Sequence, residues 1–208
     1  YNMPPWDDTE MQPLLELISS QHQRIWLIMY GDAAGYDPDH MLEGWLHQRA
    51  FRSYHGDYID GSLDLFVRGE IVSQNAIDIR FGEFILLSGF GLGKIGQDGA
   101  DTLPISLVWR ALTKMDRDYT GFIHLLDSEG KLWSQLDSQP LGGTHPTSEW
   151  TEGETVIDKL ALPLAPDLPS GNYRLVAGWY ELASMERLPA FGEDSLYDKV
   201  DLGIVEIP

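Results

Sequence analysis

The chain has 208 residues, of which 43% are hydrophobic and 23% are charged, and its formal net charge is −19 at pH 7. That size and balance are typical of a globular protein with one larger domain or two small ones. So acidic a surface repels phosphate backbones, so nucleic acid is not an expected partner. The chain has no cysteine, which excludes disulfides, thiolate nucleophiles and cysteine-based zinc sites.

Residues 1–68 read as a small α/β lobe. The apolar spacing predicts helix, strand, helix, strand and strand, at residues 11–18, 24–30, 38–46, 51–58 and 62–67. Pro38 is suited to the first turn of the second helix, with Asp37 as its cap. Asp60-Gly61 is a favoured hairpin pair between the last two strands. About 70 residues are marginally stable alone, so we expect the lobe to pack against the rest of the chain.

Residues 77–208 are nearly all strand in pattern, after a linker at residues 69–76. Short alternating or apolar runs separated by Gly/Pro turns fall at residues 77–81, 84–87, 104–113, 120–127, 131–137, 156–164, 172–182 and 200–207. Such a series predicts an antiparallel, Ig-like β-sandwich, so the fold class of the whole chain is α+β.

Two side chains support this interpretation. Tyr173 follows a Pro-Ser-Gly-Asn turn and begins a strand, so its ring can be buried while its hydroxyl bonds a nearby backbone group, as in a tyrosine corner. Asp158 shares strand parity with the apolar Val156 and Leu160, so we expect it to point inward. A buried carboxylate requires donors, and Arg110 or Arg174 could supply them.

No complete catalytic motif is present, whether a metalloprotease helix, a nucleophile elbow or a phosphate-binding loop. The most polar long loop, residues 135–150, instead favours a carbohydrate site. Sugars present C–H faces to aromatic rings and hydroxyls to amides and carboxylates. The candidate sugar-binding residues are Trp133, Gln135, Asp137, Gln139 and Trp150. The alternative for the tryptophans is a place in the core.

Oxygen-rich turns suit calcium, and the candidate calcium ligands are Asp98 and Asp101. Their spacing matches no strict calcium motif, and a solvated loop explains them equally well. We expect no other cofactor and no resident metal.

Several motifs resemble one family. The stretches that carry the resemblance are WRAL (109–112), DYTGFIHLLD (118–127), LWSQLDSQPLGG (132–143), HPTSEW (145–150), PSGNYRLVAGWY (169–180) and RLP (187–189). They are similar to the C-terminal extracytoplasmic β-sandwich of bacterial multi-spanning membrane proteins of the dolichyl-phosphate-mannose–protein mannosyltransferase-like (GT-C type) glycosyltransferase class. Residues 1–68 resemble, through Ile25–Ile28 and Trp45-Leu46, the α/β segment that follows the last membrane helices in such proteins.

The resemblance implies a location on the extracytoplasmic face of the membrane, tethered by transmembrane helices outside this sequence. In that family the catalytic acid is thought to lie between early membrane helices, so no catalytic residue is carried over. The implied partners are the membrane-embedded portion of the same polypeptide and a glycan or protein acceptor. We therefore expect a non-catalytic accessory region. The alternatives are a carbohydrate-binding β-sandwich module and a stand-alone glycoside-processing enzyme.

Overall fold

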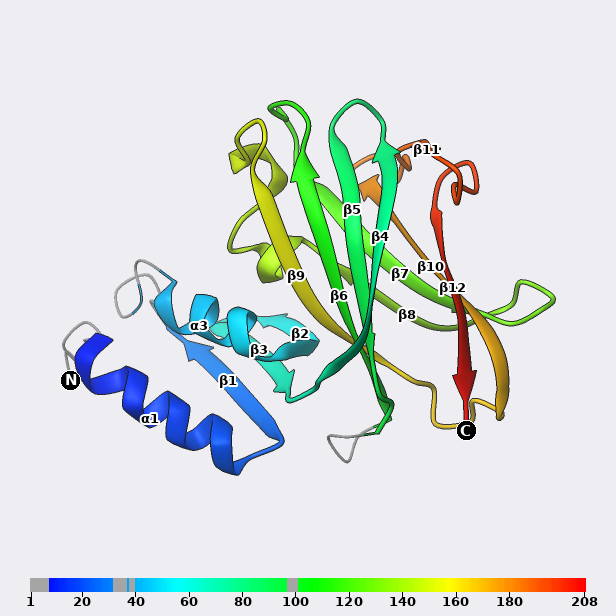
Figure 1. Ribbon diagram of the computed structural model, residues 1–208. Helices are drawn as coiled ribbons and strands as arrows, with labels where there is room; N and C mark the ends of the chain where they lie inside the picture. The colour runs from blue at the N-terminus through cyan, green and yellow to red at the C-terminus, as the bar shows by residue number, and fades with distance from the viewer. Residues whose placement is uncertain (1–7, 32–36, 38–39, 97–100) are drawn as a thin grey trace.

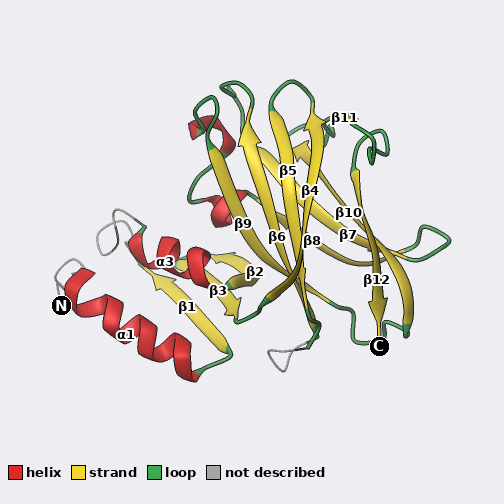
Figure 2. Ribbon diagram, viewed as in Figure 1, coloured by secondary structure: helices red, strands yellow, loops and turns green. Residues whose placement is uncertain are grey.

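The computed structural model describes residues 8–31, 37, 40–96 and 101–208. This part of the chain is mostly β-strand (Figure 2). The helices and strands, in chain order, are α1 (Asp8–Gln21), β1 (Arg24–Tyr30), α3 (Met41–Arg49), β2 (Phe51–Tyr58), β3 (Gly61–Val67), β4 (Ile71–Phe81), β5 (Ile85–Gly93), β6 (Thr102–Ala111), β7 (Tyr119–Leu126), β8 (Leu132–Ser138), β9 (Thr155–Pro163), β10 (Gly171–Glu181), β11 (Ala190–Phe191) and β12 (Val200–Ile207). Two 3₁₀ turns, η1 (Pro140–Gly143) and η2 (Thr147–Glu149), lie between β8 and β9.

The strands form two sheets. One has the order β1-β3-β2-β9-β6-β5-β4-β11, and the other has the order β12-β10-β7-β8. Figure 1 shows the long strands β4, β5, β6 and β9 side by side in front of β7, β8 and β10. All pairings are antiparallel except that of β2 with β9, which is parallel and pairs Arg52 with Leu160.

One hydrophobic core lies between the two sheets. It combines inward side chains of the larger sheet, such as Phe81 and Leu87, with those of the smaller one, such as Leu125 and Leu175. Trp109 on β6 meets Trp179 on β10 edge-on, with ring centroids 4.8 Å apart. Such contacts add about 1 kcal/mol to the burial of the rings.

The lobe has its own small core. Leu27, Leu46 and Phe66 are buried between the strands β1 and β3 and the helix α3. The second helix, α3, begins at Met41 with His40 at its N-cap position, and the predicted first-turn Pro38 lies outside the described residues. The side chain of Asp37 still caps the helix, from three residues before His40. Its carboxylate accepts the backbone N–H groups of Met41 (2.7 Å) and Leu42 (2.9 Å), two of the donors that a helix start leaves free.

The predicted linker is wrong over most of its length. Residues 71–76 belong to β4 and pair with β5. Only residues 68–70 separate β3 from β4, and the lobe strands continue the larger sheet through β2 and β9. Glycines make this pairing possible: a Cβ at Gly91 would lie 2.6 Å from the Ile71 side chain. The division into domains at residue 68 stays a prediction.

Candidate functional site

A polar cleft lies where the lobe meets the smaller sheet, between strand β2 and strand β8, and we refer to it as the β2–β8 cleft. Its volume is about 580 Å³, within the usual range for small-molecule sites. The lining residues are Arg52, Ser53, Tyr54, His55, Asp57, Thr120, Gln135, Leu136, Asp137, Ser138, Gln139, Gly142, Pro163, Tyr180 and Leu182.

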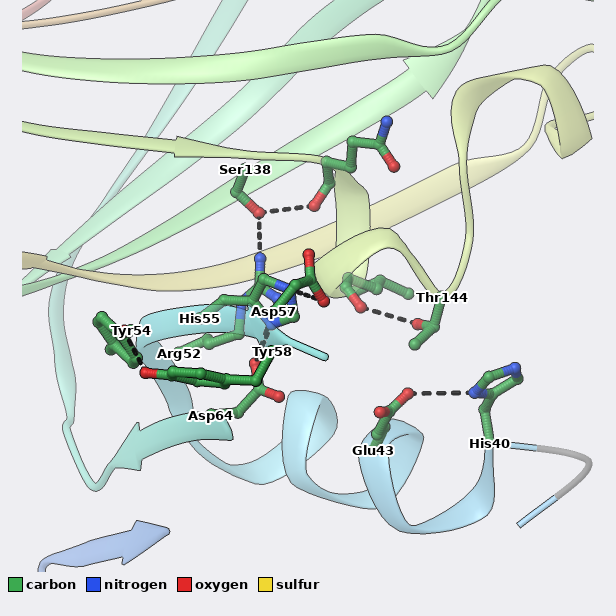
Figure 3. Close-up of polar contacts among 12 residues, drawn as sticks. His40, Glu43, Arg52, Tyr54, His55, Asp57, Tyr58, Asp64, Ser138 and Thr144 are labelled. Atoms are coloured by element: carbon green, nitrogen blue, oxygen red, sulfur yellow. Dashed lines mark hydrogen bonds and ion pairs between the residues drawn. The ribbon is translucent and has the colours of Figure 1, made fainter. Parts of the chain in front are cut away.

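Arg52 holds the two walls of the cleft together. Arg52 pairs with Phe66 of β3, and the bulge that follows Arg52 brings it to the same face of β2 as His55 and Asp57. Figure 3 shows the guanidinium reaching from β2 to Ser138 on β8, where Nη2 donates to Oγ at 2.5 Å. Its Nη1 lies 3.5 Å from Asp64. Both charged side chains are more than 90% buried, so each depends on the other for compensation.

His55 adds a second polar link on the lobe side. Its Nδ1 is 2.8 Å from a carboxylate oxygen of Asp64, and its Nε2 is 3.3 Å from a carboxylate oxygen of Asp57 (Figure 3). The side chain of Asp57 is 86% exposed. The mouth of the cleft therefore carries a solvated carboxylate, whereas the Asp64 carboxylate is committed to Arg52 and His55.

Behind this wall lies a buried acid. Asp158 on β9 is 3% exposed, which confirms that it points inward. The predicted pairing of Asp158 with Arg110 or Arg174 is wrong. Arg110 is exposed, and Arg174 pairs with Asp201 at 3.4 Å. Burial raises the pKa of Asp158 to about 6, against the lowering effects of the Arg52 charge and of a hydrogen bond from the Leu141 backbone. The alternation of the strand therefore predicts correctly that Asp158 points inward. The charge nearest to it, Arg52, lies on β2 and could not be predicted from that pattern.

His47 of α3 completes the buried cluster. Its ring packs edge-on against Phe66, with centroids 5.1 Å apart. Burial, and then the nearby Arg52 charge, lower its pKa to about 3, so it is neutral at pH 7. Gly142 of the β8–β9 loop packs against the side chains of Arg52 and His47. Its φ is 76°, and a Cβ at this position would collide with the Arg52 guanidinium and lie 2.9 Å from His47 Nε2. Glycine therefore lets the loop pack against the lobe without displacing these two side chains.

Three of the five candidate sugar-binding residues line the cleft. These are Gln135, Asp137 and Gln139, and Gln135 and Asp137 are exposed. Partial loss of hydration raises the pKa of Asp137, and the positive charge of Arg187 opposes this effect. The alternation of β8 brings Gln135 and Asp137 to one side of the strand, so the cleft can offer amide and carboxylate groups to a polar ligand.

The two tryptophans of that set lie elsewhere. Trp150 is fully buried in the main core, where its indole N–H donates to the His145 carbonyl at 3.0 Å. Trp133 is partly buried; its N–H donates to Asp127 at 2.9 Å, and Lys131 lies over its ring. Neither ring lines the cleft. Trp150 is a core residue, and a sugar-binding role for Trp133 stays a prediction. The aromatic residues of the cleft are Tyr54 and Tyr180, and Leu182 contributes an exposed apolar side chain.

The candidate calcium ligands gain no support from the structure. Asp98 lies outside the described residues, and Asp101 is exposed. Within the described ranges, no group of three or more His, Cys, Asp or Glu side chains could hold a metal ion.

The lobe half of the cleft was not found from the sequence. Arg52, His55 and Asp57 occur on a strand that mixes buried and exposed positions, and they resemble an ordinary surface strand. The hydrogen bond between Arg52 and Ser138 spans 86 residues of sequence. No local pattern signals such a pair.

No family model matches this chain, and no curated protein is significantly similar to it. Within the described residues, neither helix has both the length and the apolar character needed to cross a bilayer. The family resemblance therefore stays a prediction, and the cleft is interpreted from its own chemistry.

Proposed function

We propose that this chain is a non-catalytic, glycan-contacting region of a membrane-bound, glycosyltransferase-like protein on the extracytoplasmic face, and that the glycan binds in the β2–β8 cleft. The observation that carries the proposal is the lining of the cleft. Amides of Gln135 and Gln139 and the carboxylate of Asp137 lie beside Tyr54 and the apolar Leu182. Hydrogen-bonding groups next to apolar surface are the combination that a sugar ring requires.

The architecture supports the same proposal. We propose that the two packed sheets form the Ig-like β-sandwich that the resemblance implies. Tyr173 supports this: its hydroxyl donates to the Pro169 carbonyl at 2.8 Å, and its ring belongs to the core, as in a tyrosine corner. The membrane tether and the location rest on the resemblance of the sequence motifs alone.

The cleft suits binding better than acid–base chemistry. Its buried ionic groups are engaged: Arg52 binds Ser138, and Asp64 accepts from His55. Its free groups, Gln135, Gln139 and Asp137, can fix hydroxyls without moving protons. A stand-alone glycosidase requires two carboxyl groups set across a bound sugar. Asp57 and Asp137 both line the cleft, but Asp57 is paired with His55 at 3.3 Å, which favours binding over hydrolysis.

A glycan array probed with the purified chain tests the proposal. The double variant Gln135→Ala/Gln139→Ala is expected to weaken the binding of the strongest glycan about tenfold or more, because two amide contacts are lost. Gln74→Ala, on the exposed part of β4, is the matched control and should bind as wild type. Equal binding by the double variant would remove the cleft from the proposal. Turnover of glycosides by the chain would replace it with a hydrolytic function.

The second candidate is an independent carbohydrate-binding module. It rests on the same cleft lining, in which amide and carboxylate groups lie among aromatic and apolar side chains. The reading frame that encodes the chain separates the two candidates. Several apolar segments of about 20 residues support the membrane-bound protein, and a frame without them supports the module.

A further inference from the structure

The lobe exposes an aromatic and aliphatic surface on the outer side of its three strands. Along β1 the buried and exposed positions alternate, so Leu27 joins the lobe core whereas Trp26, Ile28 and Tyr30 point away from it. Tyr58 of β2 pairs with Gly61 of β3, which also pairs with Tyr30. With Ile59 in the adjoining turn, these side chains form what we call the aromatic face: Trp26, Ile28, Tyr30, Tyr58 and Ile59.

The exposed area of this face is large. The exposed fractions are 54% for Trp26, 69% for Ile28, 72% for Tyr30, 60% for Tyr58 and 102% for Ile59. Side chains of this size present about 150–250 Å² each when fully exposed, so the face exposes on the order of 700 Å². The largest apolar patch of a typical monomer is about 300–600 Å², and each partner in a standard protein interface buries about 800 Å².

The face also contains a hollow. An apolar hollow of about 490 Å³ lies on it, lined by residues that include Ile28, Tyr30, Tyr58 and Leu63. Ile59 is another of the residues that line this hollow, and its side chain is fully exposed. A two-fold axis through the face would set the two hollows opposite each other, with the exposed Ile59 side chains packed between the copies, as an isologous interface requires.

The charges argue against an anionic lipid surface as the occupant. None of the five side chains carries a charge at pH 7, and the adjoining turn contributes an acid, Asp60. A face without Lys or Arg gives no attraction for anionic lipid headgroups. The net charge of −19 on each chain opposes self-association at long range, but salt at physiological strength screens it beyond about 8 Å.

We infer that the aromatic face is a homodimer interface, in which the β1-β3-β2 surfaces of two copies pack together and bury Ile28 and Ile59. The interface is apolar, and the surrounding charge is repulsive. Dimerisation therefore strengthens as the salt concentration rises. A partner with a basic rim would give the opposite salt dependence.

Sedimentation velocity of the full chain, up to about 200 μM, tests the inference. Wild type is expected to dimerise, with a dissociation constant that falls as NaCl rises from roughly 20 to 300 mM. Ile28→Glu should raise that constant about 30-fold or more, because the dimer buries two added charges. Ile204→Glu is the matched control: Ile204 is 60% exposed on β12, the edge strand of the other sheet, and its replacement should leave dimerisation unchanged.

Three results would overturn the inference: a monomer at every concentration, a dimer that Ile28→Glu leaves intact, or a dimer that salt weakens. Binding of the monomer to phosphatidylcholine vesicles would instead assign the face to a lipid surface. Ile59→Glu, in an exposed turn, gives the same test if Ile28→Glu does not fold. Tyr54 lines the β2–β8 cleft, and its hydroxyl lies 3.2 Å from that of Tyr58 on the aromatic face, so glycan binding is measured on monomeric Ile28→Glu as well as on wild type.

Discussion

The buried carboxyl of Asp158 makes the stability of the protein depend on pH in an unusual direction. Burial raises the pKa of this group from 3.8 to about 6. The folded state therefore holds a proton between those pH values that the unfolded chain has released. Its contribution to stability is fully present below about pH 4 and is lost as pH rises to about 6.

The size of this effect follows from the shift. About two pKa units correspond to about 3 kcal/mol of unfolding free energy. Asp158→Asn keeps the shape of the side chain but cannot ionise. The difference in unfolding free energy, variant minus wild type, should therefore grow by about 3 kcal/mol in favour of the variant between pH 4 and pH 7.

Urea unfolding at a series of pH values, followed by tryptophan fluorescence, measures this difference. The comparison cancels all other groups, because they titrate alike in both proteins. Asp116→Asn, at a side chain that is 87% exposed, is the control and should show no such growth. Parallel stability profiles for Asp158→Asn and wild type would refute the assignment of a buried, proton-holding carboxyl.

Three further predictions concern neighbouring features. The pKa of His47 is lowered to about 3, so its effect on pH-dependent stability is opposite to that of Asp158: its contribution is lost as pH falls from about 6.5 towards 3. In His47→Gln, the loss of unfolding free energy over this pH range, measured by urea unfolding, should be smaller by several kcal/mol. Gly142→Ala should destabilise by about 1–2 kcal/mol more than Gly130→Ala, because both glycines have positive φ but only the first meets buried side chains; equal melting curves would contradict the packing of the loop on the lobe. Tyr173→Phe should cost about 1 kcal/mol in chemical unfolding through its lost hydrogen bond to a backbone carbonyl, whereas Tyr197→Phe, at a residue 88% exposed, should cost nothing measurable.

Strands could be predicted from the sequence where their buried side chains form a regular pattern. The predicted strand at residues 24–30 matches β1, and the one at 200–207 matches β12, because alternation or apolar runs mark both. The first half of β4 could not, because its residues 72–76 are exposed and show no alternation. Its partner β5 carries three glycines, which the sequence suggests as a loop.

Only the β8 wall of the β2–β8 cleft could be predicted from the sequence. Gln135 and Asp137 share one face of a single strand, and alternation alone brings them together. The opposite wall depends on Arg52, whose partners are distant in sequence and follow from packing rather than pattern. Trp150 was misplaced because an aromatic residue in a polar loop has the same sequence pattern whether it binds ligand or fills the core.

The most direct test of the account is an amide NMR titration of the ¹⁵N-labelled chain with the glycan that binds most strongly on the array. We expect progressive shifts that cluster at Gln135, Asp137 and Gln139 on one wall and at His55 on the other. Shifts confined to the surroundings of Trp133, or no shifts at saturating glycan, would contradict a carbohydrate site in the β2–β8 cleft.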